Sequence, residues 1–275
     1  MIRRLARSLG STDLPAPERE ARWILDAALS QTGSRSLSTE DLDYAVVRVA
    51  EELLRRRLSG EPLQYVTGVA GFRHLELSIG PGALIPRPET EIVAGKAMDL
   101  LPPGGLAVDV GTGSGAIALA IAQERPDATV VATDISAEAA RWARRNMDAQ
   151  ALPVHLIVCD LLSALAYDLR GRFDLIVANP PYVATGETPV LPSEVVEHEP
   201  HTALFAGADG TEVVRRLVED SPEWLAPGGW IVLEIGESQG DATRELLEQR
   251  GFGEISIERD LTGRERIARG RWPNG

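Results

Sequence analysis

The sequence predicts an α/β protein in which a small helical bundle precedes an open, doubly wound sheet. From Leu106 onward, short apolar runs of strand length alternate with helical patterns, which is typical of parallel βαβ units. A glycine-rich loop follows the first of these runs, and before residue 60 the apolar residues have helical spacing. We expect an N-terminal helical domain over residues 1–75, a hairpin and linker over 76–91, and an α/β domain over 92–275.

Composition excludes several classes of protein. Among 275 residues, 44% are hydrophobic, yet no uninterrupted apolar run approaches the roughly 18 residues of a membrane span. The first residues lack a following apolar segment, so we expect no secretory signal. The single cysteine, Cys159, excludes an intrachain disulfide and is expected to pack within a strand. A reducing, cytoplasmic location is the expectation, with no membrane partner.

Charge is distributed unevenly along the chain. The net charge is -13; residues 1–75 contain 11 Arg and 10 acidic residues and so carry +1, whereas the remainder, with 17 basic and 31 acidic residues, carries -14. An acidic surface repels a phosphate backbone, which argues against direct binding of long nucleic acid. The one basic run, Arg55 to Arg57, is predicted to be a solvated helix face.

The N-terminal region predicts two helices. One covers residues 19–31 and ends at Gly33, while Ser38 and Asp41 resemble a capping box for a second helix that closes at Gly60. The region contains no cluster of His, Cys or carboxylate suited to chemistry. Substrate recognition and simple structural support therefore both stay open as its role.

Residues 72–85 predict a hairpin. Residues 72–79 alternate apolar and polar, and the Gly-Pro-Gly at 80–82 is expected to turn the chain into a second strand at 83–85. A proline-stiffened loop around Arg87 then leads into a helix that runs to about Leu101. Arg87 is interpreted either as a surface residue or as part of the site.

The glycine loop predicts a nucleoside site. Strand 106–110 is followed by Gly111, Thr112, Gly113, Ser114 and Gly115, and then by an apolar helix. Gly111 and Gly113 allow a tight turn and close approach of a ligand, and Gly115 allows the helix to pack closely on the sheet. The next strand, 129–133, ends in Asp134, whose carboxylate can accept both hydroxyls of a ribose.

The loop favours S-adenosylmethionine over a dinucleotide. Its pattern is Gly-x-Gly-x-Gly, with Asp109 two residues before it. An acid there disfavours a pyrophosphate and suits a cofactor that carries an ammonium and a sulfonium. Asp109 is either a ligand of this cofactor or merely a residue at the end of a strand.

A second loop, after strand 173–178, contains Asn179, Pro180, Pro181 and Tyr182. Proline lacks a backbone N–H and restricts its own φ and the preceding residue, so the loop is rigid. The Asn179 side-chain oxygen and the Pro180 carbonyl can each accept one proton of a planar NH2 group, and Tyr182 offers a ring face. The alternative is a strand that ends in an ordinary turn.

The remaining chain completes the sheet. Further strands are predicted at 154–159, 230–235, 254–258 and 265–268, with helices at 210–224 and 239–250. Open doubly wound sheets bind ligands at the carboxyl ends of their strands, where Asp134, Leu161 and Asn179 fall. His198 and His201 are expected to be surface loop residues rather than a metal pair, and no metal site is predicted.

The chain resembles the HemK/PrmC family, the protein-glutamine methyltransferases that act on class 1 peptide chain release factors. The resemblance covers nearly the whole length. Its motifs are residues 60–65 (GEPLQY), 84–91 (LIPRPETE), 109–115 (DVGTGSG), 179–182 (NPPY), 199–200 (EP), 203–204 (AL) and 234–236 (EIG). Residues 84–91 together with the N-terminal bundle narrow the resemblance to this family.

The resemblance implies a class I, Rossmann-like, seven-stranded S-adenosylmethionine-dependent methyltransferase domain behind a helical N-terminal domain. The substrate that it implies is the glutamine of the release factors' Gly-Gly-Gln motif. Asn179, Pro180, Pro181 and Tyr182 would act on that glutamine, and Asn179 would also touch the cofactor. Leu161 departs from relatives that have an aromatic residue there, so its cofactor contact is expected through backbone and side-chain packing. No general base is assigned.

Two other functions stay open. A nucleic-acid methyltransferase acting on an exocyclic amine would present a similar planar NH2 group to the Asn179 loop, although the acidic surface argues against it. A cofactor-binding scaffold without catalysis is disfavoured because the loop of Asn179 to Tyr182, which we call the acceptor loop, is intact.

Overall fold

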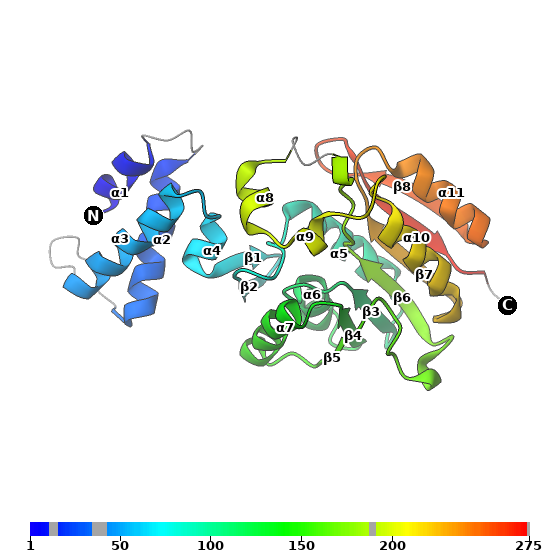
Figure 1. Cartoon of the computed structure of the whole chain (residues 1–275). Helices are drawn as coiled ribbons and strands as arrows, with labels where there is room; N and C mark the ends of the chain where they lie inside the picture. Colours follow the sequence, from blue (N-terminus) through cyan, green and yellow to red (C-terminus); the bar gives the residue numbers. More distant parts are fainter. Residues whose placement is uncertain (11–15, 35–42, 187–190, 274–275) are drawn as a thin grey trace. The chain divides into compact units, whose positions relative to one another are not determined.

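The computed structural model describes residues 1–10, 16–34, 43–186 and 191–273, which form two compact units (Figure 1). The first unit is Met1–Val69 with Ile79–Pro81 and Pro192–His198, and the second is Ala70–Ser78, Gly82–Leu191 and Glu199–Gly275. No helix in the described ranges combines the length and apolarity needed to span a membrane.

The first unit is helical, as predicted. Its helices are α1 (Ile2–Leu9), α2 (Pro17–Thr32), α3 (Tyr44–Leu58), α4 (Leu63–Thr67) and α8 (Ser193–His198). Helix α2 ends at Gly33, whose φ of 66° is the left-handed conformation that glycine adopts without steric cost. Helix α3 begins after Asp43, which accepts a hydrogen bond from the Ala45 N–H. The predicted capping residues Ser38 and Asp41 lie outside the described residues.

The prediction that Arg55 to Arg57 form a solvated face is wrong for Arg57. This side chain is buried, with its Nε 2.8 Å from Glu20 Oε2 on α2 and its Nη1 3.0 Å from Glu194 Oε2 on α8. Arg56 bonds Glu61, and Arg55 stays exposed. Helical periodicity could not reveal this arrangement, because the partners of Arg57 lie 37 and 137 residues away.

The hairpin predicted between residues 72–79 and 83–85 is wrong, although a different hairpin lies just upstream. Strands β1 (Val69–Phe72) and β2 (Leu75–Ser78) meet at Arg73 and His74, and residues 83–85 form no strand. Arg73 adopts a φ of 51°, which costs a non-glycine residue energy. Its guanidinium offsets this cost by bonding Glu124 at 2.7 Å and the Glu91 carbonyl at 2.9 Å.

The second unit contains the predicted seven-stranded sheet. Its strands are β3 (Leu106–Val110), β4 (Thr129–Asp134), β5 (Val154–Val158), β6 (Phe173–Ala178), β7 (Leu225–Glu234), β8 (Gly253–Arg259) and β9 (Glu265–Arg271). Their order is β5-β4-β3-β6-β7-β9-β8, and β9 runs antiparallel to both of its neighbours. Strand β5 ends one residue before Cys159, which therefore lies beyond the strand in which we expected it.

Helices cover both faces of this sheet (Figure 1). Helices α5 (Pro88–Leu100), α6 (Ala116–Glu124) and α7 (Ala137–Gln150) pack on one face, and α10 (Glu212–Asp220) and α11 (Gly240–Arg250) pack on the other. Alternate residues of each strand face opposite sides, so Ala107 joins one core and Val108 the other. Both faces are buried, which explains why the strand segments read as continuous apolar runs.

Short segments complete the description. One-turn 3-10 helices occur at Tyr167–Leu169 and Ser221–Glu223. His198 ends α8, and His201 begins the short helix α9 (His201–Leu204). The expectation that both histidines lie in a loop is therefore wrong. Pro200 precedes α9 as its N-cap residue.

Candidate active site

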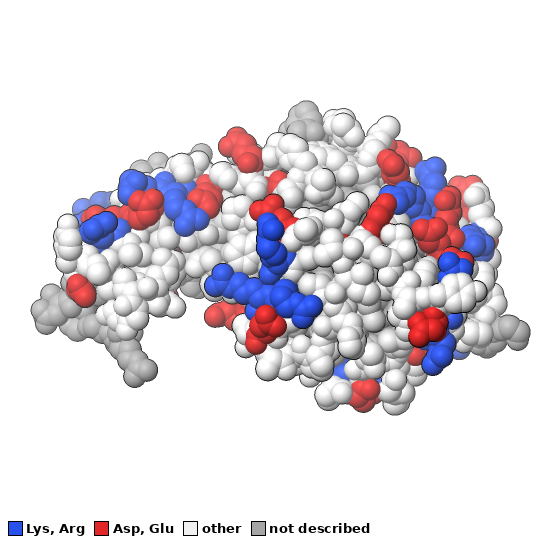
Figure 2. All heavy atoms as spheres, turned by 60° about the horizontal axis from the view of Figure 1, so that its bottom comes forward, with Lys and Arg blue, Asp and Glu red and all other residues white. Residues whose placement is uncertain are grey.

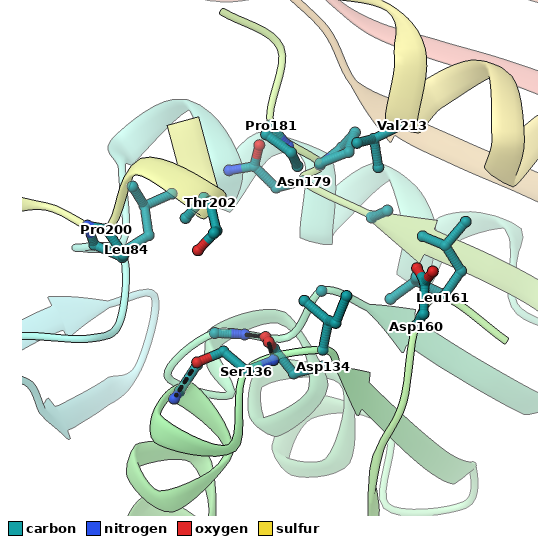
Figure 3. A pocket seen from close by; sticks show the side chains of 18 of the residues that line it. Leu84, Asp134, Ser136, Asp160, Leu161, Asn179, Pro181, Pro200, Thr202 and Val213 are labelled. Carbon is teal, nitrogen blue, oxygen red and sulfur yellow. Dashed lines mark hydrogen bonds between the residues drawn. The ribbon is translucent and has the colours of Figure 1, made fainter. Parts of the chain in front are cut away.

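A cavity of about 320 Å³ lies in the second unit at the carboxyl ends of the parallel strands (Figure 3). The sheet order changes direction here, because β3 has β4 on one side and β6 on the other. The lining comes from the ends of β3, β4 and β6, from the segments that follow these strands and β5, from helix α10, and from residues 82–84 and 200–205. The position and volume are those of a ligand site in a doubly wound fold.

Only some residues of the glycine loop, Gly111 to Gly115, line the cavity. Gly111 and Gly113 line the cavity with φ of 72° and 59°, and a Cβ built on either would meet no atom within 4 Å. Thr112, Ser114 and Gly115 are not among the lining residues. A Cβ on Gly115 would lie 3.4 Å from the Cα of Ala143, so this glycine serves the packing of α6 against α7.

Asp109 lies behind the loop and not in the cavity wall. Its Oδ2 accepts hydrogen bonds from the Thr112 hydroxyl at 2.5 Å and from the Ala118 N–H at 3.0 Å. Burial raises the pKa of Asp109 to about 7. These contacts favour the strand-end interpretation, in which Asp109 joins the glycine loop to the first turn of α6.

Asp134 lines the cavity as an acceptor. Its Oδ2 accepts from the Gly113 N–H and its Oδ1 from the Ser136 N–H, both at 2.8 Å. Burial raises the pKa of Asp134, and these two backbone hydrogen bonds oppose the shift. Each carboxylate oxygen retains a lone pair, so the group can still accept two ligand hydroxyls.

The segment after β5 adds three lining residues. Leu161 adopts a φ of 49°, and the Cys159 thiol donates to its carbonyl at 3.3 Å. Asp160 bonds Arg216 at 2.6 Å, and Arg216 also lines the cavity. Sequence reasoning missed Cys159 and Asp160 as site residues. The signal was available, since Asp160 follows β5 much as Asp134 ends β4.

The acceptor loop places three of its four predicted residues in the cavity wall: Asn179, Pro180 and Pro181. Tyr182 is not among the lining residues. Its ring lies beneath the Arg266 guanidinium at 6.0 Å, and its hydroxyl is 3.5 Å from Glu234 Oε1. Burial raises the pKa of Tyr182 to about 12, so the phenol stays protonated.

A chain of hydrogen bonds through Thr90 and Glu234 fixes the Asn179 side chain. The sequence alone assigned neither of these residues a role. The Asn179 Nδ2 donates to the Thr90 hydroxyl at 3.0 Å, and Thr90 donates to Glu234 Oε2 at 2.6 Å. Glu234 is 1% exposed, and burial raises its pKa to about 7. Both residues belong to the motifs noted at 84–91 and 234–236, which was the only signal for them.

Arg87 is engaged by the fold. Its Nη2 donates to Glu199 Oε1, and Glu199 Oε2 accepts from the Ile85 N–H at 3.2 Å. Glu199 is buried and stands next to Pro200, a lining residue. Arg87 is not among the lining residues, so its contacts support the shape of the 82–87 loop.

The cavity fits S-adenosylmethionine. Gly111 and Gly113 leave open space where side chains would project, and the carboxylate of Asp134 in the cavity wall has the acceptor chemistry that a ribose requires. Apolar side chains such as Leu161 and Val213 (Figure 3), together with Ile135, offer surfaces for an adenine ring.

Comparison with known proteins agrees with this geometry. Residues 1–68 match the PrmC N-terminal domain, and residues 96–208 match the methyltransferase small domain. Two solved structures share the fold at 20% identity. One is a methyltransferase from Pyrococcus furiosus, with a TM-score of 0.56 over 83% of this chain and 99% of that one. The other is the Thermus thermophilus 16S rRNA N2 G1207 methyltransferase, with a TM-score of 0.54 over 74% of this chain and 49% of that one.

Curated relatives are more similar in sequence. The release factor glutamine methyltransferase of Streptomyces coelicolor is 43% identical over 80% of this chain and 79% of its own. The enzyme of Geobacter sulfurreducens is 36% identical over 92% of this chain and 88% of its own. The enzyme of Xylella fastidiosa is 43% identical over 84% of both chains. At this identity and coverage, the chain belongs to the release factor glutamine methyltransferase family, whose members are S-adenosylmethionine-dependent enzymes.

Proposed function

We propose that the protein methylates the side-chain amide nitrogen of the glutamine in the Gly-Gly-Gln motif of class 1 release factors, using S-adenosylmethionine. The observation that carries the proposal is the bond from Asn179 Nδ2 to Thr90. This bond occupies the NH2 end of Asn179, so the carbonyl end is left to accept. Together with the Pro180 carbonyl it forms a pair of acceptors that suits a primary amide.

The cofactor would be held on the opposite side of the cavity. Asp134 would accept the ribose hydroxyls, and the glycine loop would approach the rest of the molecule closely. Leu161 would pack against the adenine. When bound, S-adenosylmethionine supplies an electrophilic methyl group on a sulfonium.

The acceptor loop would have two tasks in the transfer. An amide nitrogen is a poor nucleophile because its lone pair is delocalised into the carbonyl, so its alignment with the methyl group matters most; such positioning contributes up to roughly 7 to 11 kcal/mol. Methyl transfer would leave the amide nitrogen positively charged, while the cofactor would keep the electron pair of the broken C–S bond. The Asn179 and Pro180 oxygens would stabilise that charge.

No side chain in the described cavity wall is assigned as a general base. The methylated nitrogen is acidic in its charged form and can release one proton to water. Glu234 is the nearest carboxyl in the Asn179 network, but Thr90 stands between them. We therefore assign Glu234 no direct contact with substrate.

One surface feature favours a second candidate, a nucleic-acid methyltransferase. Helix α7 exposes Arg141, Arg144 and Arg145, and basic side chains gather near the middle of the face that contains it (Figure 2). Three charges at this spacing give a small positive patch, against a net charge of -13 for the chain. A protein that binds duplex by charge typically neutralises about six to ten phosphates, so we place this candidate second.

The test uses methyl-labelled S-adenosylmethionine with three acceptors: unmethylated release factor, the same factor with Gln→Ala in its Gly-Gly-Gln motif, and RNA. We expect label on the native factor alone. Label on RNA, with none on either factor, would overturn the proposal. Because release factors act in translation, we propose that the enzyme works in the cytoplasm.

A further inference from the structure

The site contains a buried carboxyl that no step of the proposed reaction uses. Glu234 ends β7, and its carboxylate bonds Thr90 at 2.6 Å and faces the Tyr182 hydroxyl at 3.5 Å. No salt bridge to Glu234 is found within the described ranges. Burying a carboxyl without an ion pair costs free energy, so we looked for a function that Glu234 serves at this position.

Hydrogen-bond direction supplies that role. An ionised carboxylate can only accept, so Thr90 must direct its single O–H at Glu234. The Thr90 oxygen then has only lone pairs to offer Asn179, which must present its NH2 end. The amide of Asn179 is thereby set in one of its two possible orientations.

This orientation decides which acceptor groups fit. Neither Asn179 Oδ1 nor the Pro180 carbonyl has a hydrogen-bond partner among the described residues. Two acceptors side by side match a group with two N–H bonds. A flipped Asn179 would pair one donor with one acceptor, which suits a hydroxyl group better than an NH2 group.

We infer that Thr90 and Glu234 are positioning residues that orient the Asn179 carboxamide and so make the acceptor site selective for a primary amide. The inference rests on the proposed function for its substrate. The orientation of Asn179, however, is a property of the protein alone and can be measured separately.

The surroundings of Glu234 make the orientation of Asn179 sensitive to pH. Burial raises the pKa of Glu234 to about 7, whereas the Thr90 hydrogen bond and Arg266 on β9 oppose the rise. Glu89 on α5 also raises it, and the Tyr182 hydroxyl lowers it. Once protonated, Glu234 can donate to Thr90, and Thr90 can then donate to Asn179. The constraint on Asn179 is therefore present above pH 7 and is lost as the pH falls below it.

The kinetic test compares Thr90→Val, Thr90→Ser and Glu234→Gln with the wild-type enzyme. Removing one preorganised polar contact at a reacting centre typically costs about 100-fold or more in kcat. We expect such a loss in Thr90→Val and a rate within about fivefold of wild type in Thr90→Ser, which keeps the hydroxyl. Glu234→Gln can donate to Thr90 at any pH, so it should be slow throughout and lack the wild-type rise in kcat near pH 7.

Thr243→Val is a matched control, because Thr243 is fully buried on α11 and its hydroxyl has no hydrogen-bond partner in the part of the chain that the structure describes. It should leave kcat unchanged. Cofactor affinity, measured by calorimetry, should be unchanged in all four variants. Equal losses in Thr90→Val and Thr90→Ser, or wild-type kcat in Thr90→Val, would overturn the inference.

A second readout needs no substrate. In 15N-labelled protein, the side-chain NH2 signals of Asn179, identified by their loss in Asn179→Ala, should exchange slowly with water in wild type and faster in Thr90→Val. Slow exchange without methyl transfer to the release factor would leave the inference standing and reject the proposed function. Identical exchange in both proteins would reject the inference itself.

Discussion

The Gly113 N–H donates a hydrogen bond of 2.8 Å to Asp134 Oδ2. This bond joins the glycine loop after β3 to the carboxylate at the end of β4, so the two parts of the proposed cofactor site are held together before any ligand binds. The Ser136 N–H fixes the other oxygen. The carboxylate is thus preorganised to accept hydroxyl groups.

Replacing Asp134 should therefore weaken cofactor binding specifically. We expect Asp134→Ala to reduce the free energy of binding by about 1.5 to 3 kcal/mol for each charged hydrogen bond lost. Isothermal titration with S-adenosylmethionine measures this, with Asp148→Ala, an exposed position on α7, as the control. Unchanged affinity in Asp134→Ala would refute the placement of the ribose.

Asn179→Ala should separate binding from turnover. It removes an acceptor of the substrate amide and leaves Asp134 and the glycine loop in place. We expect methyl transfer to the release factor to fall below detection while cofactor affinity changes little. If transfer persisted at a tenth of the wild-type rate or more, Asn179 would not be the main acceptor.

Gly210→Ala should displace the acceptor loop. Gly210 has a φ of 73°, and a Cβ there would lie 2.4 Å from the Tyr182 carbonyl oxygen and 2.7 Å from Gln239 Nε2. The Gln239 amide bonds that carbonyl at 2.8 Å. Overpacking of this kind typically costs about 1 to 3 kcal/mol. Urea unfolding should show the loss, and kcat should fall as well. Gly253→Ala, where a Cβ meets nothing within 4 Å, should change neither quantity appreciably.

Arg57→Met should destabilise the N-terminal unit. It leaves Glu20 buried without the guanidinium that bonds it, and breaking a buried pair on one side costs about 3 to 5 kcal/mol. The double variant Arg57→Met with Glu20→Leu should recover most of this loss, because the remaining partner, Glu194, is 44% exposed and no buried charge is then left unpaired. Thermal unfolding measures both. A double variant as unstable as the single one would contradict the account.

Stability should fall as the pH rises from about 4 to about 7. Burial raises the pKa of Asp109 to about 7, whereas in the unfolded chain it is near 3.9. Between these values the folded state binds a proton that the unfolded state has released, so each rise in pH favours unfolding. Urea unfolding at several pH values should show this slope, and Asp109→Asn should reduce it. Asp148→Asn should leave the slope unchanged.

Much of the fold was predictable because it depends on local pattern. Alternating strands and helices, the Gly111 to Gly115 loop and the acid at Asp134 are all visible within about 30 residues of sequence. Their grouping at one edge follows from the rule for parallel sheets. The hairpin turn was misplaced because Arg73 in a left-handed conformation is held by Glu124, 51 residues away.

The sequence by itself determined that the chain has a doubly wound sheet, and it predicted a cofactor site at the glycine loop and an acceptor site at the Asn-Pro-Pro-Tyr loop. Only the tertiary structure decided that Asp109 supports the loop from behind, that Tyr182 lies outside the cavity wall, and that Thr90 and Glu234 orient Asn179. These two contacts join residues 144 and 89 positions apart. Periodicity specifies which face of an element is buried, but the packing of α5 against β6 and β7 decides which polar groups on those faces come within hydrogen-bond distance.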